Sequence, residues 1–181
     1  MSSKILFAEH KSTCFLKMVG EVRLTQGIAL ADFFTKLLDK PNCHKLVIDL
    51  SATKTIDSTT LGLLAKLSIQ LKKRHQQTPS LISVNDDITR LLISMGFDQI
   101  LMINPKNTSS PNIPMRELFL ENSDEQTSCS RILDAHRMLM KLNGNNKKVF
   151  RQLIHQLEQQ QKKYKDSNTK KEYKSSDFLT T

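Results

Sequence analysis

Tryptophan is absent from this chain of 181 residues, and only two residues are tyrosine. Proteins that hold nucleic-acid bases by stacking use such aromatic side chains, so the composition disfavours a base-binding platform.

Cysteine is also scarce: Cys14, Cys43 and Cys129 are odd in number and irregular in spacing. This usage predicts reduced thiols in a cytoplasm rather than a disulfide framework.

Long apolar runs are missing as well. Asp49, Lys66 and Arg90 interrupt the apolar segments, and none approaches the roughly 18 to 20 residues that span a membrane. The N-terminal run, Ile5 to Ala8, is too short for the apolar core of an export signal. We therefore expect a soluble, cytoplasmic protein with no membrane partner.

Positive charge exceeds negative charge: 27 Lys and Arg against 18 Asp and Glu give a net charge of +9. The excess is densest between Lys147 and Lys174, where nine basic residues accompany Glu158, Asp166 and Glu172. The simplest interpretation is a solvated helix face followed by a tail. The functional alternative is a docking surface for an acidic protein or for nucleic acid, and binding to nucleic acid would weaken steeply with salt.

Apolar periodicity predicts an α/β fold. Alternation before and after residues 11–13 predicts two strands that form an N-terminal hairpin. Short apolar runs predict further strands at 46–50, 80–85 and 99–104. Helical spacing predicts helices from Thr25 to before Pro41, from Ser58 to about residue 75, and over 86–97. This alternation implies right-handed crossovers and a parallel sheet covered by helices.

Residues 104–114 have a linker composition, with three prolines among small polar residues. Beyond them, helical spacing that begins at Leu118 and Phe119 predicts two helices separated by Asn143-Gly144. These helices must bury their apolar stripes against the first domain or against another protein. We predict a domain over residues 1–104, a linker over 105–114, a helical hairpin over 115–165 and a disordered tail over 166–181.

The segment TIDSTTLGLLAKL, residues 55–67, places a carboxylate and several hydroxyls between a predicted strand and a predicted helix. In such sheets the functional loops follow the carboxyl ends of strands, and a helix N-terminus presents unpaired N–H groups and a positive dipole end. Either Asp57 or Ser58 can cap this helix. A phosphate would also be well placed there, so capping and phosphorylation are compatible roles.

The segment KLVIDLSATKTIDSTTLGLLAKL, residues 45–67, resembles the signature of the STAS family, named for sulfate transporters and anti-sigma factor antagonists. In that signature a buried strand precedes D-S-[ST]-G-L-G or a close variant. MVGEV at 18–22 and LLISMGFDQILMI at 91–103 resemble further family segments, so the resemblance covers residues 4 to about 104. It implies a STAS-like sheet, with an N-terminal hairpin and then parallel strands, covered by helices. Thr60 departs from the pattern, because glycine is usual there.

The resemblance also implies a function. In soluble bacterial members, an anti-sigma factor that is also a serine kinase phosphorylates the serine after the aspartate, and a serine phosphatase reverses the reaction. The matching position is Ser58, with Thr59 as second choice. The implied protein is a non-enzymatic anti-sigma factor antagonist of a partner-switching pathway, which regulates transcription by binding the kinase when unphosphorylated. The implied partner-binding residues are Asp57, Ser58, Thr59, Thr60, Leu61 and Gly62.

Two other interpretations stay open. Residues 131–157 resemble the C-terminal extension of some single-domain antagonists that control motility and biofilm formation, so the chain could be a STAS scaffold that regulates another signalling enzyme. Such an extension suggests a further protein contact at the C-terminal helices. The second alternative is nucleic-acid binding through the basic C-terminus, which the aromatic composition disfavours.

Other chemistry-bearing residues fit structural roles better. Cys43-His44 has no second Cys or His pair at metal spacing. His136 and His155 fall on the apolar side or flank of the C-terminal helices, which is typical of packing or surface residues. Asp86 or Asp87 caps the helix over 86–97, and Gly96 ends it. Because glycine-rich phosphate-binding motifs are also absent, we expect no catalytic residue, metal or cofactor.

Overall fold

The computed structural model describes residues 3–40, 43–104, 113–118 and 124–176, and gives the backbone alone for residues 24–29 and 165–176. Six strands form one mixed sheet in the order β5-β4-β3-β2-β1-β6. Their bounds are β1 Lys4–His10, β2 Thr13–Val22, β3 Lys45–Ile56, β4 Ser80–Ile82, β5 Met102–Asn104 and β6 Arg116–Glu117. Strands β2 to β5 pair in parallel, and β1 is antiparallel to both β2 and β6.

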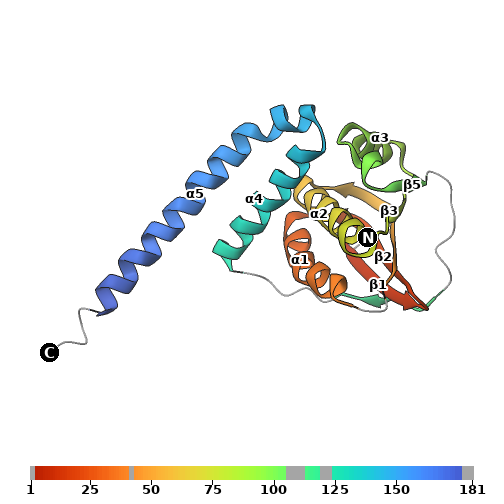
Figure 1. Ribbon diagram of the computed structural model, residues 1–181, viewed down its shortest axis with the longest axis horizontal. Coiled ribbons are helices and arrows are strands. Elements are labelled where there is room, and N and C mark those ends of the chain that lie inside the picture. The colour runs from red at the N-terminus through yellow and green to blue at the C-terminus, as the bar shows by residue number, and fades with distance from the viewer. Residues whose placement is uncertain (1–2, 41–42, 105–112, 119–123, 177–181) are drawn as a thin grey trace.

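Helices connect the parallel strands and extend the C-terminus (Figure 1). Their bounds are α1 Leu24–Leu38, α2 Ser58–His75, α3 Asp86–Ser94, the short 3-10 helix η1 Phe97–Gln99, α4 Glu125–Leu142 and α5 Gly144–Ser176. The predicted fold class, an N-terminal hairpin followed by parallel strands under helices, is confirmed.

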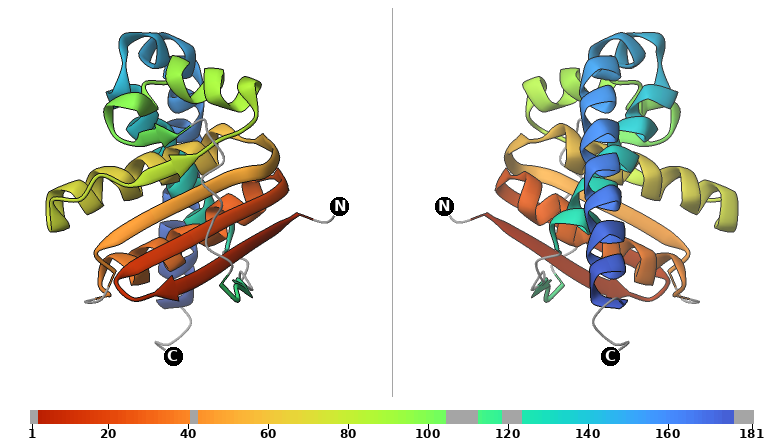
Figure 2. Two further views of the ribbon diagram at one scale, coloured as in Figure 1. Left: turned by 90° about the vertical axis from the view of Figure 1, so that its right-hand side faces the viewer. Right: turned by 90° about the vertical axis from the view of Figure 1, so that its left-hand side faces the viewer.

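Alternation along β2 decides which face of the sheet is the core. Cys14, Leu16 and Met18 are buried in the main apolar cluster, which also holds the helix leucines Leu61 and Leu64. The neighbours Phe15, Lys17 and Val19 are half-buried on the opposite face, which carries no helix among the described residues (Figure 2). Helices α1 and α2 cover the apolar face.

The C-terminal helices pack onto the first domain. Helix α4 lies against α2 and α1, and α5 runs antiparallel along the outer side of α4 (Figure 1). The turn between them is held to the end of α3, because Asn143 Nδ2 donates to Ser94 O at 3.1 Å and Asn146 Nδ2 donates to Met95 O at 2.9 Å. The apolar stripes of α4 and α5 are therefore buried within the same chain. The sequence alone did not decide between this arrangement and burial against another protein.

Several local expectations need correction. Strand β3 continues beyond Leu50 to Ile56, because its second half pairs with the end of β2. Asn85, rather than Asp86 or Asp87, caps α3, and its side chain accepts from the N–H groups of Asp87 and Ile88.

The C-terminal half also differs from expectation. Leu118 does not begin a helix; it follows β6, donates its N–H to Ile5 O at 2.8 Å, and α4 starts only at Glu125. Phe119 lies outside the described residues. The segment after residue 166, expected to lack regular structure, continues as α5 to Ser176, and residues 177–181 are not described. The domain boundaries at 104 and 115 remain predictions.

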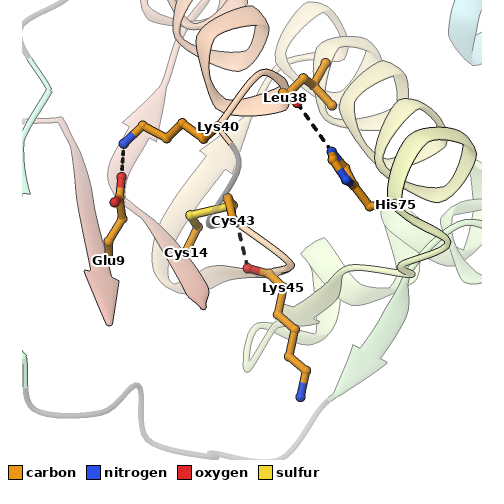
Figure 3. Close-up of a disulfide and its surroundings, with 7 residues drawn as sticks. All are labelled: Glu9, Cys14, Leu38, Lys40, Cys43, Lys45 and His75. Atoms are coloured by element: carbon orange, nitrogen blue, oxygen red, sulfur yellow. Dashed lines mark hydrogen bonds and ion pairs between the residues drawn. A yellow bond between two sulfur atoms is a disulfide. The ribbon is translucent and has the colours of Figure 1, made fainter. Parts of the chain in front are cut away.

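The structure joins Cys14 to Cys43 in a disulfide with a Cα–Cα distance of 5.8 Å (Figure 3). Cys14 lies at the start of β2 and Cys43 just before β3, and parallel pairing of these strands brings the two together. Sequence spacing gives no signal of this proximity. The expectation of reduced thiols is therefore wrong for this pair, while Cys129 is free and buried.

Thiol titration checks the disulfide. Denatured protein that has not been reduced should contain one titratable thiol per chain, that of Cys129. After reduction it should contain three. Three thiols without reductant would restore the original expectation of a fully reduced chain.

Candidate functional site

The junction of β3 and α2 consists of a single residue, Asp57. Its backbone is extended, with φ −85° and ψ 163°, and its carboxylate accepts from the N–H of Thr60 at 2.8 Å. Asp57 N–H also donates to Val22 O at 3.3 Å, which fixes the junction to the end of β2. Asp57 is thus the helix cap, and Ser58 is the first residue of α2.

Ser58 faces His136, a residue of the C-terminal helix α4. Its Oγ lies 3.0 Å from His136 Nε2, and His136 Nδ1 lies 2.9 Å from Ile132 O. A carbonyl oxygen only accepts, so Nδ1 carries the proton and the neutral ring offers Nε2 as an acceptor. The Ser58 hydroxyl therefore donates to His136. Ser58 is half-buried.

His136 is enclosed by three helices. Its side chain is buried, and the ring of Phe150 from α5 packs on it edge-on at a centroid distance of 5.1 Å. Burial lowers the pKa of His136, because the charged form loses hydration, while its hydrogen bond to Ile132 O and the nearby Asp57 carboxylate partly oppose this change. The ring is held neutral, which suits the acceptor role of Nε2.

Acidification should loosen this contact. Because the pKa of His136 in the folded protein lies below its ordinary value of 6.5, the unfolded chain takes up the proton first as pH falls. The free energy of unfolding is therefore highest above about pH 6.5 and decreases as the pH falls below this value. Urea unfolding across this range should show the decrease in wild type and a smaller one in His136→Gln, which cannot titrate. Equal slopes for both proteins would remove His136 from this role.

Helices α2 and α4 touch through their backbones near Gly62. A Cβ added at Gly62 would lie 2.3 Å from Ala135 O and 2.8 Å from Ala135 Cα. No real side chain tolerates such distances, so glycine at 62 is what permits α4 to approach. Ala135 is itself fully buried.

Charged residues surround this contact. Lys66 Nζ lies 3.5 Å from Asp134 Oδ2, and Arg131 pairs with Asp32 of α1. A cavity of about 260 Å³ opens among Asp32, Lys66 and Arg131, at the seam between α1, α2 and α4.

A family model described as "Mlab, STAS domain" matches residues 5–103. The chain belongs to the STAS family. Among solved structures, an anti-sigma factor antagonist from Mycobacterium paratuberculosis is 24% identical with a TM-score of 0.50, covering 58% of this chain and 87% of that one. A proposed anti-sigma factor antagonist from Thermotoga maritima is 21% identical with a TM-score of 0.48, covering 54% and 82%. No curated protein matches the sequence.

The STAS match ends before the C-terminal helices. Both α4 and α5 lie beyond residue 103, so the contact between Ser58 and His136 joins the family domain to an added segment.

In the described residues no helix is long and apolar enough to cross a membrane.

The residues that the resemblance assigned to partner binding lie together at the start of α2, and four of the six are buried. Thr59, Thr60 and Leu61 are 4%, 0% and 1% exposed, and Gly62 is under Ala135. The Oγ1 of Thr60 has no hydrogen-bond partner in the part of the chain that the structure describes. This arrangement leaves Asp57 and Ser58 as the half-buried members of the set.

His136 is the residue that the sequence interpretation undervalued. Its pattern is typical of a packing or surface residue, and its one visible signal is a polar side chain within the apolar stripe of α4. The remaining candidates are placed elsewhere. Cys43 is bonded to Cys14, and His155 is exposed beside Gln159. Within the described ranges, no group of three metal-ligating side chains comes together.

Proposed function

We propose that this STAS protein is an anti-sigma factor antagonist in a partner-switching pathway. In its unphosphorylated form it binds an anti-sigma factor that is also a serine kinase. Phosphorylation at Ser58 releases that partner, and a serine phosphatase restores binding. The protein acts by binding and not by catalysis.

One observation carries this proposal: Ser58 is the first residue of α2, directly after the cap Asp57 and the end of β3. A phosphate there gains from the N–H groups and the positive dipole end of the helix. The name of the Mycobacterium structure, which shares the fold, agrees with the proposal.

Charge explains how a phosphate would switch binding. It adds about −1.5 to −2 charge beside the carboxylate of Asp57. The helix N-terminus accommodates this charge within the domain, whereas a partner surface built against a neutral hydroxyl meets repulsion and a desolvation cost. The domain therefore stays folded while the interface weakens.

A kinase cannot reach Ser58 in the observed arrangement without moving α4. The hydroxyl is hydrogen-bonded to the buried His136, and a transferred phosphate needs space around the oxygen that accepts it. Phosphorylation therefore requires the contact between Ser58 and His136 to open, whether or not the rest of α4 leaves α2.

Variants of Ser58 test the proposed function. A partner that co-purifies with Ser58→Ala from the native cell, and is then produced alone, should bind Ser58→Ala at least as tightly as wild type in calorimetry. Ser58→Asp should bind it at least about tenfold more weakly, which corresponds to roughly 1.4 kcal/mol.

Ser94→Asp is the matched control, because Ser94 is an exposed serine near the end of α3 whose hydroxyl donates to Leu91 O. It should leave the affinity unchanged. Equal affinities for wild type, Ser58→Ala and Ser58→Asp would refute the switch.

A further inference from the structure

The contact between α4 and the first domain is built like an interface between two proteins. Such interfaces have a closely packed centre and a polar rim. At the centre, Gly62 lies under the backbone of Ala135. At the rim, Lys66 pairs with Asp134, and Arg131 with Asp32, beside the cavity at the seam.

Polar groups at the centre of the contact add to this likeness. Ser58 and His136 form a hydrogen bond between α2 and α4. The hydroxyl of Ser58 thus meets a polar side chain across the contact, as polar groups do in interfaces between proteins.

The chain itself joins α4 to the face that it covers. The family domain ends near residue 103, and α4 begins only at Glu125, after the short strand β6. Because α4 and this face belong to the same chain, a separate partner must compete with α4 at a high effective concentration.

We propose that the α1/α2 face formed by Asp32, Ser58, Gly62 and Lys66 is a helix-docking surface, and that α4 occupies it as an intramolecular competitor of the partner. This inference rests on the proposed function for the identity of that partner, but the surface is defined by this chain alone. Partner binding then requires the α4–α5 hairpin to leave the face.

The residues of α4 specify the helix that the surface accepts. Such a helix carries a small residue opposite Gly62, as Ala135 does, and a hydrogen-bonding side chain opposite Ser58, as His136 does. An acidic residue faces Lys66 and a basic residue faces Asp32, in the places of Asp134 and Arg131. The partner helix should match this pattern of size and charge.

A labelled synthetic peptide of residues 124–143 serves as the probe. Full-length Ala135→Arg places a long charged side chain where the backbones of α2 and α4 meet, so its own α4 should leave the face. The wild-type peptide should bind this variant at least tenfold more tightly than it binds wild-type protein. Amide exchange over residues 59–64 should be faster in the free variant and slow again when the peptide is bound.

Two controls make the result decisive. A peptide that itself carries Ala135→Arg should bind neither protein. A second full-length variant, Arg131→Asp with Asp134→Lys, reverses both rim charges on α4 and should also bind the wild-type peptide more tightly than wild-type protein does.

Other outcomes would overturn the proposal. Folded Ala135→Arg that keeps slow exchange at residues 59–64 and ignores the peptide would show that α4 is a fixed part of the core. Failure of both variants to fold would show the same. Because no kinase or partner is used, this test can fail while the Ser58 switch holds, and the converse is also true.

Discussion

Replacing Gly62 by valine should lower the free energy of unfolding by about 2 to 3 kcal/mol, the usual cost of overpacking a tightly packed interior. A Cβ at this position would lie 2.3 Å from Ala135 O, and the obstacle is helix backbone that cannot turn away as a side chain does. Either α4 shifts as a whole or it leaves α2. Both outcomes remove the hydrogen bond between Ser58 and His136.

Urea unfolding followed by circular dichroism measures this effect. Gly144→Val is the matched control, since a Cβ at Gly144 meets nothing within 4 Å, and its stability should stay within about 0.5 kcal/mol of wild type. Equal midpoints for the two valine variants would show that α4 does not lie on Gly62.

Replacing Leu139 by alanine should cost about 3 kcal/mol, within the range for truncating a buried leucine. Leu139 is on α4, is 0% exposed, and belongs to the same apolar cluster as Leu61 and Leu64. Its truncation leaves a cavity between the C-terminal helices and the first domain, so the loss combines transfer free energy with the cavity term.

Lys141→Ala on the same helix is the control, because Lys141 is exposed, and its effect should stay within about 0.5 kcal/mol. Comparable losses for both variants would mean that α4 is not docked. If Gly62→Val and Leu139→Ala act by undocking the same helix, the double variant should lose less than the sum of the single losses.

Short-range patterns predicted most of the first domain. The alternation before and after residues 11–13 predicted the hairpin of β1 and β2, and the helical spacing after Ser58 predicted α2. Asp57 was one of two predicted caps, and the structure selects it because its carboxylate reaches the N–H of Thr60. These features depend on residues close in sequence, where periodicity and capping chemistry act directly.

The remaining features depend on contacts between distant residues, which periodicity does not encode. Cys14 and Cys43 meet because β2 and β3 pair in parallel, and no spacing rule for cysteine expresses that. Gly62 fits the family pattern, but only the docked α4 explains why it must lack a side chain here. The burial of Ser58 under α4 likewise could not be predicted from the helix that Ser58 begins.

Thr60 illustrates what the structure adds to the interpretation of a single residue. The sequence marked it as a departure from the usual glycine. In the structure it is 0% exposed and its Oγ1 lacks a partner among the described residues. Threonine in place of the usual glycine thus adds a buried hydroxyl to α2.

The proposed switch is tested most directly by mass spectrometry of the protein purified from its native cell. The proposed function predicts that a fraction of the chains carries one phosphate, and that fragmentation of the peptide containing residues 55–67 assigns it to Ser58. A phosphate found only at Thr59, or only elsewhere in the chain, would contradict it.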